Sequence, residues 1–148
     1  MTTDSLIKSP VKSPFEPCKL TTGQQSILDR AISASKRAYC PYSHFSVGAC
    51  VEDENGNFYE GCNVENASYG LTNCAERTAI FSGVASGMRK IRTIAIVADT
   101  PNPVSPCGAC RQVISEFSDK NTVIILANMK GSAVVISLKD ILPYGFDL

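Results

Sequence analysis

Residues 91–127, IRTIAIVADTPNPVSPCGACRQVISEFSDKNTVIILA, contain two short apolar runs on either side of a segment with the composition of a helix. Residues 91–98 and 122–127 are rich in isoleucine, valine and alanine and have the length of buried strands. Residues 107–117, between them, predict a helix. A strand–helix–strand order implies two parallel strands joined by a right-handed crossover, so this segment predicts an α/β fold.

The flanking residues predict the remaining elements of the same sheet. Thr22 and Gln25 have capping-box spacing, which indicates a helix that begins at Thr21 or Thr22 and ends before Pro41. The other helices are expected over residues 73–86 and 137–141. The other strands are expected over residues 46–52, 58–64 and 133–137. We therefore expect a mixed sheet with helices on both faces and one antiparallel hairpin at its start.

The length and composition are those of one domain. The chain has 148 residues, of which 44% are hydrophobic, and this is enough for a core without disulfide bonds. Residues 1–20 contain three prolines and no hydrophobic period. We therefore expect a flexible extension over residues 1–20 and a folded domain over residues 21–148.

Charge and hydropathy exclude several classes of function. Fourteen basic and fourteen acidic residues give no net charge, and a nucleic-acid partner is therefore not expected. The longest apolar runs, 94–98 and 123–127, are far shorter than the roughly 20 residues of a membrane-spanning helix. No secretory signal pattern is found at the N-terminus. We expect a soluble, cytoplasmic protein that does not bind membranes.

The cysteines indicate a metal site. There are seven, an odd number that cannot pair completely, and thiols stay reduced in the cytoplasm. Some are therefore expected to bind metal or take part in catalysis. His44 is the only histidine, which excludes any site that needs two. The cysteines interpreted as spare, mostly buried thiols are Cys18, Cys40, Cys50 and Cys62.

Residues 105–111, SPCGACR, predict the first turn of a helix with two metal ligands. Ser105 suits the N-cap position and Pro106 the first helical position. Cys107 and Cys110 would then share one face of the helix. Since a helix N-terminus lowers the pKa of a thiol, both sulfurs would be ready metal ligands there.

A second predicted helix start supplies a third sulfur, that of Cys74. Three protein ligands leave the fourth tetrahedral position of Zn²⁺ open for water, as in catalytic rather than structural zinc sites. The alternative is that Cys74, Cys107 and Cys110 are simply buried thiols. Cysteines at a pair of predicted helix starts favour the zinc site.

Charged residues follow the expected ligands directly. Glu76 would reach toward the metal-bound water as a general acid and base, although Asn73 and Glu76 also have capping-box spacing. Three thiolates would leave the site electron-rich. We therefore expect Arg77 or Arg111, with Arg77 favoured, to donate hydrogen bonds to sulfur.

Together, Cys74-x-Glu76 and Pro106-Cys107-x-x-Cys110 form the two halves of a zinc-deaminase signature. The sequence resembles cytidine deaminases, specifically the small homotetrameric type with three cysteine ligands. The resemblance covers residues 20–146 and implies a three-layer α/β/α sandwich around a mixed five-stranded sheet. Its motifs are YCPYSHF (39–45), GCNVENA (61–67), CAERTAI (74–80), PCGACRQ (106–112) and LP (142–143).

The resemblance also implies an activity, in which residues 21–148 form the catalytic domain. Cytidine and 2′-deoxycytidine would be hydrolysed to uridine and 2′-deoxyuridine with release of ammonia, a step of pyrimidine salvage, with one zinc ion per subunit. Glu76 would move protons between water, N3 and the leaving amine. The residues that the resemblance places at the substrate are Phe45, Asn63, Glu65, Ala67, Tyr69 and, from a neighbouring subunit, Phe146.

Two other functions stay open at this point. In a zinc-stabilised interaction module, Cys62 would be the fourth ligand and no water would remain on the metal. Alternatively, the chemistry is the same but the substrate is a cytosine-bearing antibiotic or a modified nucleoside. A carboxylate at Glu65, near the sugar, favours a free nucleoside because it repels phosphate.

Overall fold

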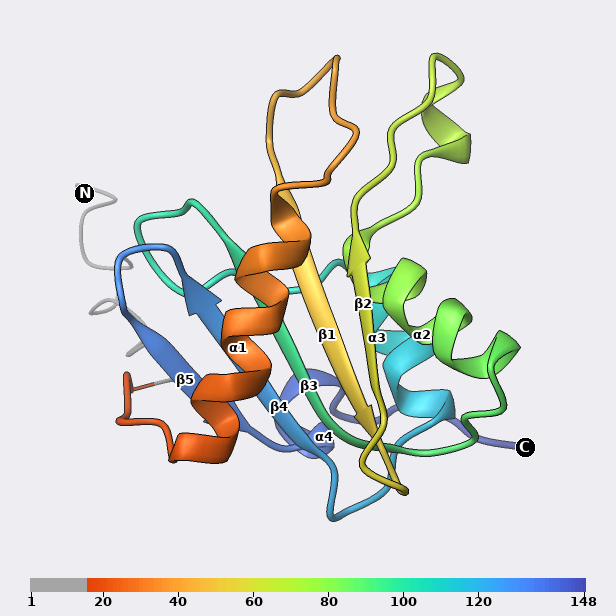
Figure 1. Cartoon of the computed structure of the whole chain (residues 1–148). Coiled ribbons are helices and arrows are strands. Elements are labelled where there is room, and N and C mark those ends of the chain that lie inside the picture. The colour runs from red at the N-terminus through yellow and green to blue at the C-terminus, as the bar shows by residue number, and fades with distance from the viewer. Residues whose placement is uncertain (1–15) are drawn as a thin grey trace, which may run out of the picture.

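The computed structural model describes residues 16–148, which form one five-stranded sheet with helices on both faces (Figure 1). The strands are β1 (Val47–Asp53), β2 (Phe58–Cys62), β3 (Ile91–Ala98), β4 (Val123–Asn128) and β5 (Ala133–Ile136). The helices are α1 (Thr22–Ser35), α2 (Ala75–Ala85), α3 (Gly108–Glu116) and α4 (Leu138–Ile141), with a 3-10 turn, η2, at Tyr69–Leu71. The strand order is β2-β1-β3-β4-β5, and the expected mixed α/β sheet is confirmed.

The β3–α3–β4 unit lies at the centre of this sheet. β3 and β4 are parallel, as the strand–helix–strand order predicts, and all other neighbouring strands are antiparallel. Side chains of β3 alternate between two apolar clusters. Ile94 and Ile96 pack with α2, α3 and α4 on one face, whereas Ala95 and Val97 pack with α1 on the other. The three-layer arrangement follows from this alternation.

Helix α1 begins one residue before the predicted capping box. Thr21 is the N-cap: its Oγ1 accepts the N–H of Gln24 at 3.2 Å, while the Gln24 side chain accepts the N–H of Thr21 at 3.0 Å. Thr22 and Gln25 have the same spacing, so the sequence alone does not select the register. The predicted N-cap is therefore wrong by one residue, and Thr22 is the first helical residue rather than the cap.

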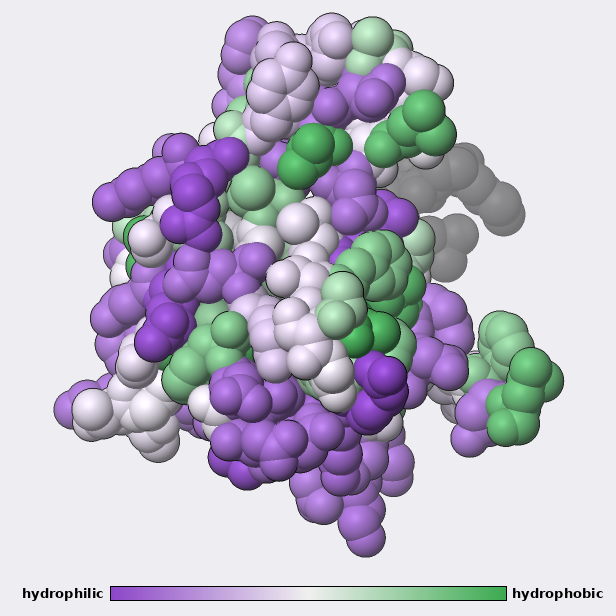
Figure 2. All heavy atoms as spheres, turned by 45° about the vertical axis from the view of Figure 1, so that its right-hand side comes forward, coloured by the Kyte–Doolittle hydropathy of each residue, from purple (hydrophilic) through white to green (hydrophobic). Residues whose placement is uncertain are grey.

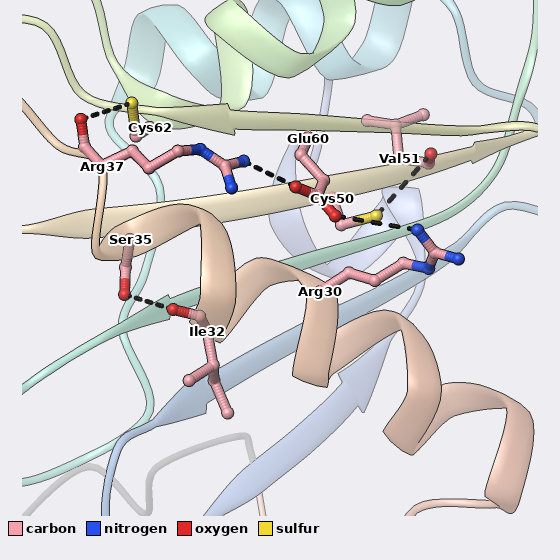
Figure 3. A network of polar contacts seen from close by, with 8 residues as sticks. All are labelled: Arg30, Ile32, Ser35, Arg37, Cys50, Val51, Glu60 and Cys62. Carbon is pink, nitrogen blue, oxygen red and sulfur yellow. Dashed lines mark hydrogen bonds and ion pairs between the residues drawn. The ribbon is translucent and has the colours of Figure 1, made fainter.

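A polar network ties α1 to the edge strand β2 (Figure 3). The carboxylate of Glu60 accepts from Arg37 Nη2 at 2.6 Å and lies 3.7 Å from Arg30 Nη1. Arg30 also lies 4.3 Å from the ring centroid of Phe58. Cys50 is buried beside this network, and burial raises the pKa of its thiol to about 12. This thiol therefore stays neutral and inert, as expected for a spare cysteine.

A residue that precedes α1 contacts the sheet. The amide of Cys18 donates to the carbonyl of Ala133 in β5 at 2.8 Å. Residues 1–15 of the expected extension lie outside the described residues, so the boundary between residues 20 and 21 stays a prediction. None of the helices in the described part of the chain has the length and hydropathy needed to cross a membrane.

Two glycines allow the helices to approach the sheet closely. A Cβ on Gly48 would overlap the carbonyl oxygen of Ala31 in α1. A Cβ on Gly61 would overlap the carbonyl oxygen of Ala75 and the amide nitrogen of Ala79 in α2. Gly61 therefore sets the distance between β2 and the first turn of α2.

We predict that Gly61→Ala lowers the free energy of unfolding by about 1–3 kcal/mol, because the added methyl group meets rigid backbone. Urea denaturation followed by circular dichroism measures this loss. Gly23→Ala in α1 is the matched control, since nothing lies within 4 Å of the added Cβ and alanine favours a helix. Equal stabilities for the two variants would contradict the close approach of α2 to β2.

Candidate metal centre

Three cysteine sulfurs meet where the first turns of α2 and α3 lie side by side (Figure 1). The Sγ atoms of Cys74, Cys107 and Cys110 all lie within 4.8 Å of one another, and the Cys74–Cys107 distance is 3.9 Å. Tetrahedral zinc with Zn–S bonds of about 2.3 Å places its sulfurs about 3.8 Å apart. Donor type and spacing therefore fit Zn²⁺.

Both helices use a cysteine as N-cap residue. Cys74 is the N-cap of α2, and Cys107 is the N-cap of α3, with its Sγ accepting from the amide of Cys110 at 3.5 Å. The prediction of Ser105 as N-cap is therefore wrong by two residues. The physical reason is a competing partner, because Ser105 Oγ accepts instead from Arg111 Nη2 at 2.8 Å.

Arg77 is the cation beside the sulfurs. Its Nη2 donates to Cys74 Sγ at 3.3 Å. The thiol of Cys110 and then Arg77 lower the pKa of Cys74 to about 5, whereas the neighbouring Cys74 and burial raise the pKa of Cys110. Arg77 Nε is buried and has no hydrogen-bond partner within residues 16–148. The guanidinium group therefore contacts the sulfur of Cys74 through Nη2, while its Nε is buried without a partner.

Glu76 lies in the first turn of α2 and is 4% exposed. Burial raises the pKa of its carboxyl group. The alternative role as a capping residue is wrong, because the N-cap of α2 is Cys74 and no side chain caps this helix start. Asn73 instead donates its Nδ2 to Thr78 Oγ1 at 3.0 Å. The Glu76 carboxyl group is thus available for chemistry beside the three sulfurs.

The strand end at residues 63–65 runs beside the metal centre, because Val64 pairs with Asn73. Asn63 is buried there, and it holds the backbone of the preceding loop with both of its polar atoms. Its Nδ2 donates to the carbonyl of Phe45 at 2.7 Å, and its Oδ1 accepts the N–H of Val47 at 2.9 Å. Asn63 therefore fixes the position of Phe45, which is 40% exposed.

Glu65 holds the same loop from a second point. Its Oε1 accepts the N–H groups of Tyr42 at 2.9 Å and of Ser43 at 3.1 Å, and hydrogen bonds from Ser43 and Tyr42 lower the pKa of its carboxyl group. It lines a cavity of about 380 Å³ together with Tyr42, Ser43, Tyr69 and Thr72. The structure therefore brings Glu65 and Tyr69 together, with the Tyr69 ring edge-on to Tyr42 at 5.9 Å.

The structure does not place Phe146 at this cavity. Phe146 lines a different hollow, formed by α3, α4 and the C-terminal residues, and is 71% exposed. Ala67 is also exposed. Hydrophobic side chains are scattered over the side of the molecule drawn in Figure 2.

The sequence does not predict the hydrogen bonds by which Asn63 and Glu65 fix the loop before β1. No local pattern links residues about 20 positions apart.

Cys62, the fourth ligand of the interaction-module alternative, is placed elsewhere. Its Sγ contacts the carbonyl of Arg37 at 3.5 Å. Among residues 16–148, the group of metal-ligating side chains contains Cys74, Cys107 and Cys110 but not Cys62. Three sulfurs without a fourth leave a coordination position for water.

Comparisons with known proteins agree with this geometry. Residues 21–126 match the family "Cytidine and deoxycytidylate deaminase zinc-binding region". The chain is 47% identical to the cytidine deaminase of Sporosarcina psychrophila over 82% of this chain and 90% of that protein. It is 48% identical to that of Halalkalibacterium halodurans over 83% and 93%, respectively. The crystal structure of the Burkholderia pseudomallei cytidine deaminase superposes with a TM-score of 0.81 at 46% identity, covering 86% of this chain and all of that one.

We predict that Cys74→Ala abolishes zinc binding, because two sulfurs without the third form too weak a site. Elemental analysis of purified protein should give about one zinc per wild-type chain and close to none in the variant. Cys62→Ala is the matched control and should keep its zinc. Loss of zinc from the Cys62 variant would favour a closed structural site.

Proposed function

The chain belongs to the cytidine and deoxycytidylate deaminase family, and we propose that it hydrolyses cytidine and 2′-deoxycytidine to uridine and 2′-deoxyuridine, releasing ammonia. The observation that carries this proposal is the cluster of three sulfurs with a buried carboxyl group two residues after the first. Such a donor set leaves a position for water on zinc and provides a proton carrier next to it. The proposed role of the enzyme is pyrimidine salvage.

The chemistry divides between the metal and the protein. When bound, zinc lowers the pKa of a coordinated water toward neutrality, which makes water a nucleophile at C4 of the base. Glu76 accepts the proton of that water, delivers it to N3, and then assists protonation of the departing amine. Its buried position excludes bulk water from these transfers. Arg77 holds the thiolate of Cys74 and offsets part of the negative charge.

Residues 63–65, which run beside the metal centre, support a nucleoside as substrate. We place the sugar at Asn63 and Glu65, and the base near Phe45, Ala67 and Tyr69. The Glu65 carboxylate, which has a lowered pKa, accepts hydrogen bonds from sugar hydroxyls and repels phosphate. Free nucleosides are therefore preferred to nucleotides and nucleic acids.

A homotetramer completes the proposed active site. Tyr69 is 76% exposed and Phe146 is 71% exposed, and the two line separate hollows of one chain. An aromatic side chain from a neighbouring subunit would close the substrate pocket. We also propose a cytoplasmic location, which the seven free cysteines support because oxidising compartments favour disulfides.

The two alternatives differ in their support. The position of Cys62, hydrogen-bonded to Arg37, speaks against a closed zinc site in an interaction module. No contact in the described residues favours a cytosine-bearing antibiotic over cytidine. A substrate panel separates these cases: cytidine, deoxycytidine, their monophosphates and a cytosine-containing oligonucleotide, each followed by ultraviolet absorbance. Turnover of the nucleosides alone is expected, and turnover of none of them would contradict the proposal.

We predict that Glu76→Gln keeps the fold and the zinc but lowers kcat on cytidine by about 10²–10⁴-fold, because proton transfer is lost. The matched control is Glu116→Gln, which changes an exposed carboxyl group at the end of α3. It should retain the wild-type rate. A near-normal rate in the Glu76 variant would refute the assigned proton carrier.

A further inference from the structure

Arg111 connects the metal-binding loop to the C-terminal end of the chain. Within the loop, its Nε donates to the carbonyl of Pro106 at 2.9 Å and its Nη2 to Ser105 Oγ at 2.8 Å. Its Nη1 donates to the carbonyl of Ile141, 30 residues later, at 3.1 Å. One guanidinium group therefore contacts both the segment directly before Cys107 and the last residue of α4.

These three bonds fix a geometry rather than only adding stability. The guanidinium group is planar and its N–H donors point in fixed directions, so the three acceptors are held at set relative positions. The carbonyl of Ile141 is at a helix C-terminus, where intrahelical partners are missing. Ile141 itself is buried in the same cluster as Ile114 of α3. Arg111 thus joins two segments that are each anchored in the core.

The C-terminal arm, residues 142–148, begins directly after this contact. The amide of Leu142 donates to Leu138 and that of Gly145 donates to Leu142. Tyr144 has a φ of 57°, in the left-handed region, so the arm turns sharply there. Phe146 follows this turn. A shift of Ile141 would therefore be passed to Phe146 through a short, hydrogen-bonded turn.

We propose that Arg111 is a positioning residue that fixes the metal ligand Cys107 relative to the C-terminal arm. Through Pro106 and Ser105 it holds the loop that presents Cys107, and through Ile141 it holds the start of the arm. Its hydrogen bonds go to Pro106, Ser105 and Ile141 and not to a cysteine sulfur, whereas Arg77 donates to Cys74 Sγ. The part of the proposal that concerns turnover rests on the proposed deaminase function, whereas the part that concerns metal retention and the arm does not.

Zinc release tests the first half on the full-length protein loaded with zinc. Arg111→Ala should release zinc to a chromogenic chelator about tenfold faster than the wild type, because the ligand loop loses two of its supports. Arg111→Lys, which cannot reach all three acceptors, should lie in between. The matched control is Arg89→Ala, since Arg89 donates to the carbonyls of Val84, in the last turn of α2, and Met88, which follows that helix. It should release zinc at the wild-type rate.

Amide hydrogen exchange tests the second half on the same proteins. A peptide that covers residues 141–148 should exchange faster in Arg111→Ala, because the carbonyl of Ile141 is no longer held and the amides of Leu142 and Gly145 are less protected. Its exchange rate should be unchanged in Arg89→Ala. On cytidine, Arg111→Ala should lower kcat/KM less in a Phe146→Ala background than in the wild type, since both changes act through the arm.

Three results would overturn the proposal: zinc release within twofold of the Arg89 control, unchanged exchange in the arm, or full additivity of Arg111→Ala and Phe146→Ala. A wild-type protein that binds zinc but does not turn over cytidine would contradict the proposed function instead. The release and exchange measurements would then still decide the role of Arg111. An Arg111→Ala variant that fails to fold is replaced by Arg111→Lys in all three comparisons.

Discussion

The meeting of two helix N-termini is the contact on which the site depends. Helices carry partial positive charge at their N-terminal ends, and the first turns of α2 and α3 place the sulfurs of Cys74, Cys107 and Cys110 together at two such ends. The rest of the fold brings these ends together. Helix α2 reaches β2 because Gly61 has no side chain, and α3 connects the two central parallel strands, β3 and β4. A zinc site with a free position is the consequence.

Residues around this centre serve the scaffold and the chemistry together. Asn63 and Glu65 hold the loop that carries Phe45 and, in the proposed mechanism, also bind the sugar. Arg77 donates a hydrogen bond to the sulfur of Cys74, and Arg111 positions the loop before Cys107. Because each of these side chains contacts backbone or sulfur at fixed points, substrate groups meet a surface that is already ordered. This preorganisation reduces the entropy lost on binding.

Much of the fold and the metal site could be predicted from the sequence, because local patterns encode them. Runs of β-branched residues mark the strands, and the cysteine spacing marks the ligands. The exact starts of the helices are harder to predict from the sequence. Thr21 and Thr22 have equivalent capping patterns, and Ser105 accepts a hydrogen bond from Arg111 instead of capping α3. The hydrogen bond between Glu65 and Tyr42 joins residues 23 positions apart, and that between Arg111 and Ile141 joins residues 30 positions apart. Such contacts depend on the tertiary fold and leave no local signal.

X-ray absorption spectroscopy at the zinc edge tests the central claim most directly. Three sulfur atoms at about 2.3 Å and one oxygen or nitrogen atom at about 2.0–2.1 Å are expected around the metal of the purified protein. That result would mean that two helix starts hold the ion and leave one position for water. Four sulfur neighbours, or protein that retains no zinc at all, would contradict the account.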